Sequence, residues 1–128
     1  MKKLVSFLGF IAFLGCCLNS QAQHVLYCMP GEYTIEYVCK YTHTSSGSCN
    51  ADFYDVTFYL TNHSDKTYSF TNWNVHRKRY QCDNPSTYND HFNISNFSLK
   101  PGEVKKGYVT TAVKEDRGCP DNWGWSIR

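Results

Sequence analysis

The stretch Tyr54-Asp55-Val56-Thr57-Phe58-Tyr59-Leu60-Thr61 decides the fold class of this chain. Apolar side chains occupy every second position from Tyr54 to Leu60, and the positions between them are polar except for Tyr59. A period of two is typical of a β-strand that buries one face and exposes the other. We therefore expect a half-buried strand here, with Tyr59 on its outward face.

The same period recurs on both sides of this stretch. It predicts seven short strands in all, at 33–41, 54–61, 68–70, 73–80, 92–99, 104–113 and 123–127. The apolar phase changes within 92–99, which indicates a bulge or bend near Ser95-Asn96. The polar turn at 62–66 predicts a hairpin between 54–61 and 68–70. Seven strands with almost no helical periodicity predict an all-β, antiparallel, two-layer sandwich, and an eight-stranded barrel is the alternative.

The first 22 residues have the three regions of an export signal. Lys2 and Lys3 precede an apolar run at 4–18, which is shorter than the roughly 20 residues of a membrane-spanning helix. We expect cleavage after Ala22, which leaves residues 23–128 as one secreted or periplasmic domain without a transmembrane segment. The alternative is a membrane-anchored lipoprotein, because Phe13-Leu14-Gly15-Cys16 loosely matches a lipobox with Cys16 as the lipidated residue.

Loss of the signal makes the domain formally neutral. The chain has 13 Lys and Arg against 11 Asp and Glu, and removal of Lys2 and Lys3 leaves 11 against 11. A neutral domain has no overall field to attract nucleic acid, so we expect no nucleic-acid partner. After the signal, the sequence contains no close Cys or His pair, no nucleophile turn and no glycine-rich phosphate loop. We therefore expect no metal, no cofactor and no enzymatic activity.

Five cysteines follow the signal: Cys28, Cys39, Cys49, Cys82 and Cys119. In a small exported domain this density predicts disulfides, because the compartment is oxidising and the core is small. Five thiols form at most two bridges in any of 15 pairings, so the sequence leaves the connectivity open. If Cys16 were lipidated, Cys17 would stay in the mature protein. Six cysteines would then be available for disulfides, which is an even number.

Two segments resemble bacterial immunoglobulin-like sandwich domains. In 55–70 a strand ends in Asn62-His63-Ser64, and in 97–103 the turn Leu99-Lys100-Pro101-Gly102-Glu103 precedes a later strand. The group includes adhesive modules, surface-anchored repeats and small proteinase inhibitors. The resemblance covers some 25 of the 106 residues after the signal. It implies an immunoglobulin-like sandwich and does not select an activity.

A charge run at 76–79 supplies the candidate ligand site. Arg77 and Arg79 share one face of the strand predicted at 73–80, and Trp73 and Tyr80 lie near them. Arginine pairs with an aromatic surface are suited to anionic or glycan ligands. The competing interpretation is an edge strand, where charges discourage pairing with other sheets.

The function that we expect from these observations is a non-enzymatic binding module. Its partner would be a protein or a cell-surface glycan, since surfaces rich in Tyr, Asn and Ser suit both. One alternative is a proteinase inhibitor that presents the loop at 42–50 or at 81–90 to an enzyme cleft. Another is a structural lipoprotein of the envelope.

Overall fold

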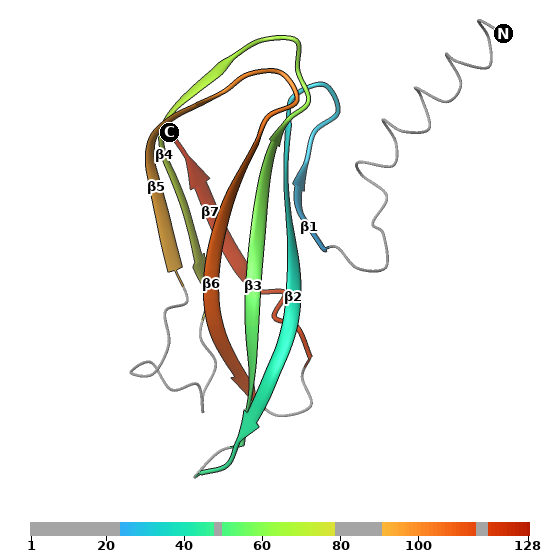
Figure 1. Cartoon of the computed structure of the whole chain (residues 1–128), viewed down its shortest axis with the longest axis vertical. Coiled ribbons are helices and arrows are strands. Elements are labelled where there is room, and N and C mark those ends of the chain that lie inside the picture. The colour runs from blue at the N-terminus through green and yellow to red at the C-terminus, as the bar shows by residue number, and fades with distance from the viewer. Residues whose placement is uncertain (1–23, 48–49, 79–90, 115–117) are drawn as a thin grey trace, which may run out of the picture.

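The computed structural model describes residues 24–47, 50–78, 91–114 and 118–128 (Figure 1). In these ranges the chain forms no helix and seven strands: β1 (His24–Cys28), β2 (Tyr33–Ser45), β3 (Ala51–Asn62), β4 (Tyr68–Arg77), β5 (His91–Leu99), β6 (Val104–Lys114) and β7 (Trp123–Ile127). The predictions outside the described residues concern the export signal, Cys16, Cys17, Cys49, Arg79, Tyr80, Cys82 and the loop at 81–90.

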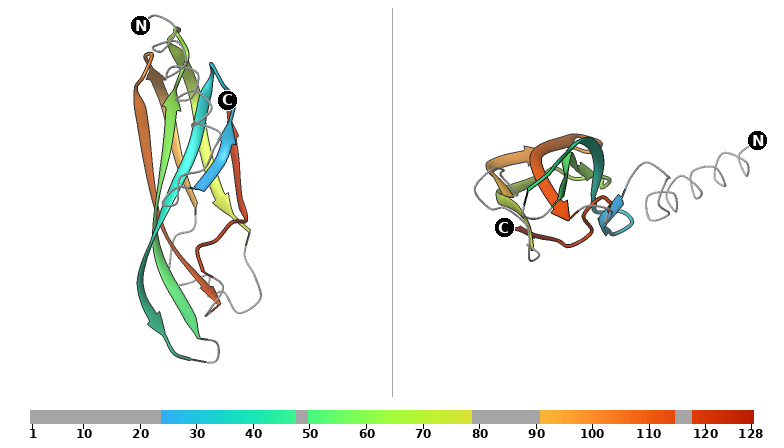
Figure 2. Two further views of the ribbon diagram at one scale, coloured as in Figure 1. Left: turned by 90° about the vertical axis from the view of Figure 1, so that its right-hand side faces the viewer. Right: turned by 90° about the horizontal axis from the view of Figure 1, so that it is seen from below.

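The strands form two antiparallel sheets. One has four strands in the order β1-β2-β3-β6, and the other has three in the order β5-β4-β7. The sheets lie against each other as two layers (Figure 2), so the predicted all-β antiparallel sandwich is confirmed. Constant-type immunoglobulin domains also have sheets of four and three strands, but numbered along the chain their order is 1-2-5-4 and 3-6-7.

The core lies between the two sheets and is rich in aromatic rings. Phe58 of β3 contacts Trp123 of β7 edge to face, with ring centroids 4.9 Å apart, and Trp73 of β4 meets Phe92 of β5 at 5.1 Å. Phe58 and Trp73 are completely buried. Aromatic side chains bury large areas, and edge-to-face pairs add about 0.5–1.5 kcal/mol each, so this ring cluster holds the two sheets together.

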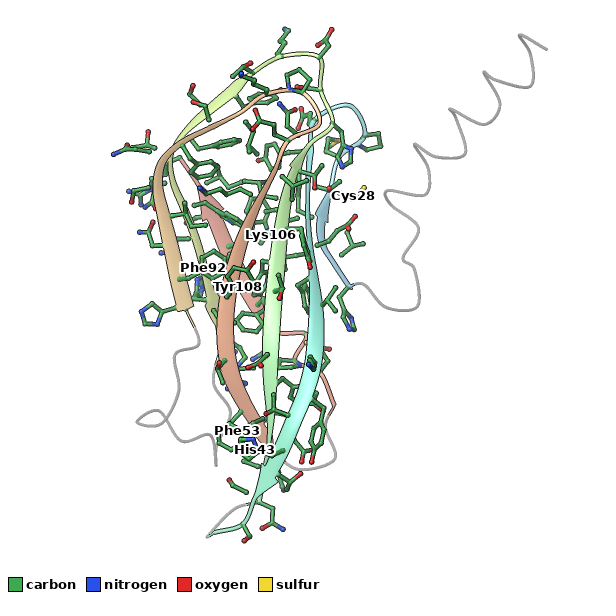
Figure 3. The ribbon with its side chains drawn as sticks, in the orientation of Figure 1. Cys28, His43, Phe53, Phe92, Lys106 and Tyr108 are labelled. Atoms are coloured by element: carbon green, nitrogen blue, oxygen red, sulfur yellow. A yellow bond between two sulfur atoms is a disulfide. The ribbon has the colours of Figure 1, made fainter. Side chains whose placement is uncertain are left out.

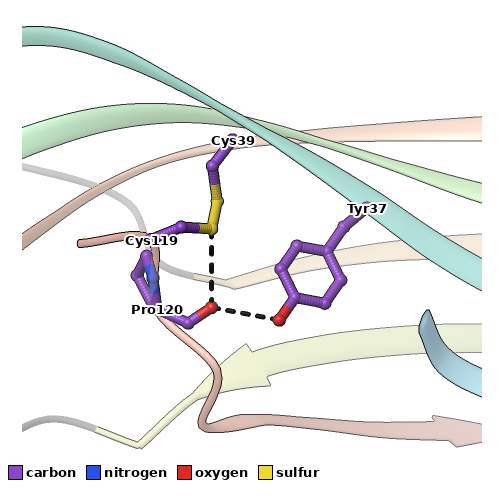
Figure 4. The surroundings of a disulfide bond; sticks show 4 residues. All are labelled: Tyr37, Cys39, Cys119 and Pro120. Carbon is purple, nitrogen blue, oxygen red and sulfur yellow. Dashed lines mark hydrogen bonds between the residues drawn. A yellow bond between two sulfur atoms is a disulfide. The ribbon is translucent and has the colours of Figure 1, made fainter. Parts of the chain in front are cut away.

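A disulfide between Cys39 and Cys119 also links the two layers. Cys39 lies in β2 of the four-stranded sheet, and Cys119 precedes β7 of the three-stranded sheet. Beside it the Tyr37 hydroxyl donates a hydrogen bond to the Pro120 carbonyl oxygen at 3.1 Å (Figure 4). Cys28 is disulfide-bonded as well. These bridges confirm that the chain contains disulfides, which fits an extracellular or periplasmic protein.

The strands predicted at 68–70 and 73–80 are one strand, β4. Its buried positions shift from Phe70 to Trp73 and Val75, so the strand changes phase near Thr71. Asn96 on β5 lies opposite Thr71 and has a φ of 50°. Thr71 and Asn96 do not form a strand pair, although the residues on either side of them do. The bend that the sequence predicts near Ser95-Asn96 is confirmed, and its counterpart on β4 explains why one strand resembled two.

The predicted hairpin between 54–61 and 68–70 is wrong, because β3 and β4 belong to different sheets. Asn62, which is completely buried, holds the connection at a corner. Its amide nitrogen donates to the carbonyl oxygens of Lys66 at 2.7 Å and Leu99 at 3.0 Å, and its amide oxygen accepts from Ser64. These bonds turn the chain from one layer to the other.

Candidate functional site

The ligand site predicted around Trp73 and Arg77 is not at the surface. Trp73 is 0 % exposed and Arg77 is 5 % exposed, because their alternate positions on β4 face the interior of the sandwich. The Arg77 guanidinium donates through Nη2 to the carbonyl oxygen of Ala112 on β6 at 2.9 Å, and so joins the two sheets. Neither side chain is available to a ligand at the surface. The edge-strand interpretation is also wrong, since β4 lies between β5 and β7.

A different part of the molecule presents side chains to solvent. The lower parts of β2 and β3 extend beyond the three-stranded sheet (Figure 1), and every residue from Lys40 to Ser45 is exposed. We call residues 40–45 and 51–54 the hairpin end. Strand β2 continues to Ser45, so the loop predicted at 42–50 is wrong in its first part: residues 42–45 are strand.

Two ring pairs occupy the hairpin end. The imidazole of His43 stacks on the ring of Phe53 with centroids 4.5 Å apart and an interplanar angle of 7° (Figure 3). Tyr41, which is 53 % exposed, meets Tyr54 edge to face at 5.9 Å. Phe53 and Tyr54 are successive residues of one strand and therefore point to opposite faces of the sheet. Each face of the hairpin end thus carries one ring pair.

Polar contacts fix this arrangement. The Thr44 hydroxyl donates to Asp52 Oδ1 at 2.6 Å and lies 2.6 Å from the Tyr41 hydroxyl, while the Thr42 hydroxyl donates to the Phe53 carbonyl oxygen at 3.1 Å. Burial raises the pKa of Tyr54 above its ordinary value, and the charge of Asp52 raises it further. The Tyr54 phenol therefore remains a hydrogen-bond donor at neutral pH.

The outer face of the four-stranded sheet carries a second group of exposed side chains. Tyr59 faces outward, as the sequence predicts, and the Lys106 ammonium lies 5.6 Å from the centre of its ring. Tyr108, two positions further along β6, is 66 % exposed (Figure 3). Glu36 stands directly opposite Tyr59 in the register. This face mixes aromatic rings with charges of both signs.

The sequence interpretation missed His43 and Phe53. Ser and Gly at 45–48 led us to expect a loop from Thr42 onward. The signal for a longer strand was present, because Tyr41-Thr42-His43-Thr44 places ring side chains in alternation with β-branched threonine. Strand period was therefore a better guide at this point than loop composition.

The described residues show no feature that indicates a metal centre or a membrane span. Within the described ranges, no group of three or more His, Cys, Asp or Glu side chains is placed to bind a metal ion. The same part of the chain contains no helix that is long and apolar enough to cross a bilayer. In comparisons with known proteins, no family model, no curated protein and no solved structure matches this chain.

Proposed function

We propose that this protein is an exported, non-enzymatic binding module that recognises a protein partner through its hairpin end. The observation that carries the proposal is one ring pair on each face of a hairpin that extends beyond the three-stranded sheet, with Tyr41 and His43 as the exposed members of the two pairs. Aromatic side chains are enriched at protein interfaces because they bury large areas at a small cost in conformational entropy. The Thr44–Asp52 and Thr42–Phe53 hydrogen bonds hold the rings in place before any partner arrives.

Export is part of this proposal. The features that support it are the signal-like first 22 residues and the disulfides of Cys28 and of Cys39 with Cys119. The immunoglobulin-like resemblance is also a proposal, supported by two antiparallel sheets of four and three strands. A lipoprotein anchored through Cys16 remains the alternative to a soluble product.

A proteinase inhibitor is the second candidate function. The observation that favours it is the Cys39–Cys119 disulfide, which fixes β2 next to the first exposed residue of the hairpin end. Inhibition of a proteinase requires a rigid projecting segment, since flexibility would reduce affinity. An inhibitor of this kind would contact its enzyme with the same residues, so both functions predict loss on the same substitutions.

The test uses a photoreactive amino acid at Ser45, with Ser126 on the other sheet as the matched position. We expect the purified, folded protein to crosslink from Ser45, and not from Ser126, to a protein of the native host's envelope or medium. Unlabelled wild type should compete for the partner and reduce this crosslink. The Tyr41→Ser, Phe53→Ser double variant should compete at least tenfold less well, because truncation of an aromatic hot-spot residue costs about 2 kcal/mol or more of binding free energy.

The control is Tyr108→Ser, which removes an exposed ring outside the hairpin end and should compete like wild type. Equal crosslinking from both positions, or equal competition by the double variant, would contradict the proposal. Inhibition of a proteinase in a broad panel, lost in the double variant, would select the second function.

A further inference from the structure

The outer face of the three-stranded sheet has an unusual composition, and we call its outward-facing residues the neutral face. These positions of β4, β5 and β7 hold Ser, Thr, Asn, His and one Gly, without Asp, Glu, Lys, Arg or any apolar side chain. Like residues face each other across β4 and β5: Ser69 opposite Ser98, Asn74 opposite Asn93, and His76 opposite His91. A row of hydroxyl and amide groups therefore covers the sheet.

Solubility alone does not account for this composition. Strand β5 is at the edge of its sheet in the described part of the chain, and edge strands are ordinarily protected from unwanted pairing by charged residues. The nine residues of β5 contain no acidic or basic side chain other than His91. The opposite sheet does place charges, Glu36 and Lys106 among them, on its outer face. The absence of charge is thus a property of the neutral face and not of the whole surface.

The phase change in β4 and β5 opens a shallow hollow at the neutral face. The hollow has a volume of about 380 Å³ and is lined by Ser69, Phe70, Thr71, Asn96, Phe97 and Ser98. Asn96 stands at its positive φ in the centre of the bend, and asparagine tolerates this conformation better than most residues. The volume falls within the range of small-molecule sites, about 300–1,000 Å³.

The side chains that line the hollow on the outer face are polar. The hydroxyls of Ser69 and Ser98 lie 3.0 Å apart, and Thr71 and Asn96 add a further hydroxyl and an amide. Phe70 and Phe97, the next residues along each strand, point to the inner face of the sheet, where their rings stack with centroids 4.9 Å apart and belong to the core. Lys105 lies with its ammonium 5.7 Å from the centre of the Phe97 ring, but it does not line the hollow. No lining group carries a charge that would attract an ionic ligand.

We propose that this hollow binds an uncharged sugar residue of a polysaccharide. A neutral sugar matches the lining because its hydroxyl groups can exchange hydrogen bonds with the hydroxyls of Ser69, Thr71 and Ser98 and with the amide of Asn96. An anionic glycan would lose hydration on entering without gaining a cationic partner. Neighbouring sugars would continue over Asn74, Asn93 and Ser126, which lie side by side across the three strands. This site is separate from the hairpin end, so the two proposals succeed or fail independently.

The experiment is a titration of the ¹⁵N-labelled protein, produced in a bacterial host, followed by nuclear magnetic resonance. The probes are hexasaccharides of glucose, galactose, mannose and N-acetylglucosamine, with a sulfated dextran fragment as the anionic probe. We expect at least one neutral series to shift the amide signals of Ser69, Thr71, Asn96 and Ser98, and the sulfated probe to leave them in place.

Two variants locate the site. Asn96→Gly removes the amide group and keeps a residue that accepts the positive φ, and the Ser69→Ala, Ser98→Ala double variant removes the paired hydroxyls without a buried change. Each variant should weaken binding about tenfold, as expected when hydrogen bonds to a ligand are lost. Tyr108→Ser on the opposite sheet should bind like wild type.

The proposal is overturned if no neutral hexasaccharide binds, if only the sulfated probe binds, or if both variants keep wild-type affinity. Shifts confined to Tyr41, His43 and Phe53 would overturn it as well, because they would assign the sugar to the hairpin end.

Discussion

The outer face of the four-stranded sheet carries Tyr59, Lys106 and Tyr108 with charges of both signs, whereas the outer face of the three-stranded sheet is uncharged. Their inner faces are alike, since both bury aromatic and aliphatic side chains at alternate positions. The four-stranded sheet also extends past its partner and leaves the hairpin end uncovered (Figure 1). Packing therefore explains the inner faces, and the differences that indicate binding lie on the outside.

This comparison holds only if the two sheets fold as one unit, and the disulfide between them tests that condition most strongly. Replacement of both Cys39 and Cys119 by alanine should lower the free energy of unfolding by about 4 kcal/mol, because the bridge closes a segment with a sequence separation of 80. Chemical denaturation monitored by tryptophan fluorescence measures the change. A loss below about 1 kcal/mol would mean that the ring cluster alone joins the sheets.

The Tyr37–Pro120 contact at the same junction predicts a pH dependence. Burial, with a smaller effect from Asp121, raises the pKa of Tyr37 to about 12 in the folded protein, above the ordinary value of 10. The stability from this group is complete below pH 10 and is lost as the pH rises through 12, by about 2 kcal/mol.

Tyr37→Phe is the reference for this effect, because it has no phenol to titrate. At pH 7 the variant should be about 1 kcal/mol less stable than wild type, since it lacks the hydrogen bond to Pro120. The difference should shrink and then reverse between pH 10 and 12 in urea denaturation. Parallel pH profiles for the two proteins would contradict the prediction.

Alanine substitution of two glycines tests how tightly an inner face and an outer face are packed. A Cβ at Gly107 of β6 would meet the ring of Phe92, which packs in the core against Phe58 and Trp73, so Gly107→Ala should cost about 2 kcal/mol. The nearest atoms that a Cβ at Gly124 of β7 would meet belong to the imidazole of His76, a side chain that is exposed at the surface and has room to shift toward solvent.

Gly124→Ala should therefore change stability by less than about 0.5 kcal/mol. Thermal and urea unfolding of the two variants, measured side by side, check the contrast. Equal losses would show that the His76 side chain is held as firmly as the core and that the neutral face is more rigid than its exposure indicates.

Much of the fold was predictable, because the alternation of apolar and polar residues along a strand shows directly which of its faces is buried. It located β3 and β6, the bend at Ser95-Asn96 and the end of the chain at β7. It missed β1, whose residues 24–28 form a short run without alternation because all five are half-buried. It placed β3 and β4 in one hairpin, because the corner depends on the bond from Asn62 to Leu99, a residue distant in the sequence.

The candidate site was less predictable than the fold. Arg77 belongs to a charge run, and charge in a sequence indicates exposure, but tertiary packing placed its guanidinium beside the carbonyl of Ala112. His43 and Phe53 lie ten positions apart in the chain, so only the register of β2 with β3 brings them together. The hollow at Asn96 likewise requires two strands to change phase at the same level.

The Cys39–Cys119 bridge also determines how the molecule responds to mechanical force. Between His24 and Arg128 a fully extended chain would reach about 350 Å, but with the bridge closed only residues 24–39 and 119–128 can be drawn out, about 80 Å. Tension applied at the two ends would peel away β1 and β7 and then pass through the sulfur atoms. The hairpin end and the hollow both lie between Cys39 and Cys119, so both proposed contacts belong to a segment that tension at the two ends cannot fully extend while the bridge is closed.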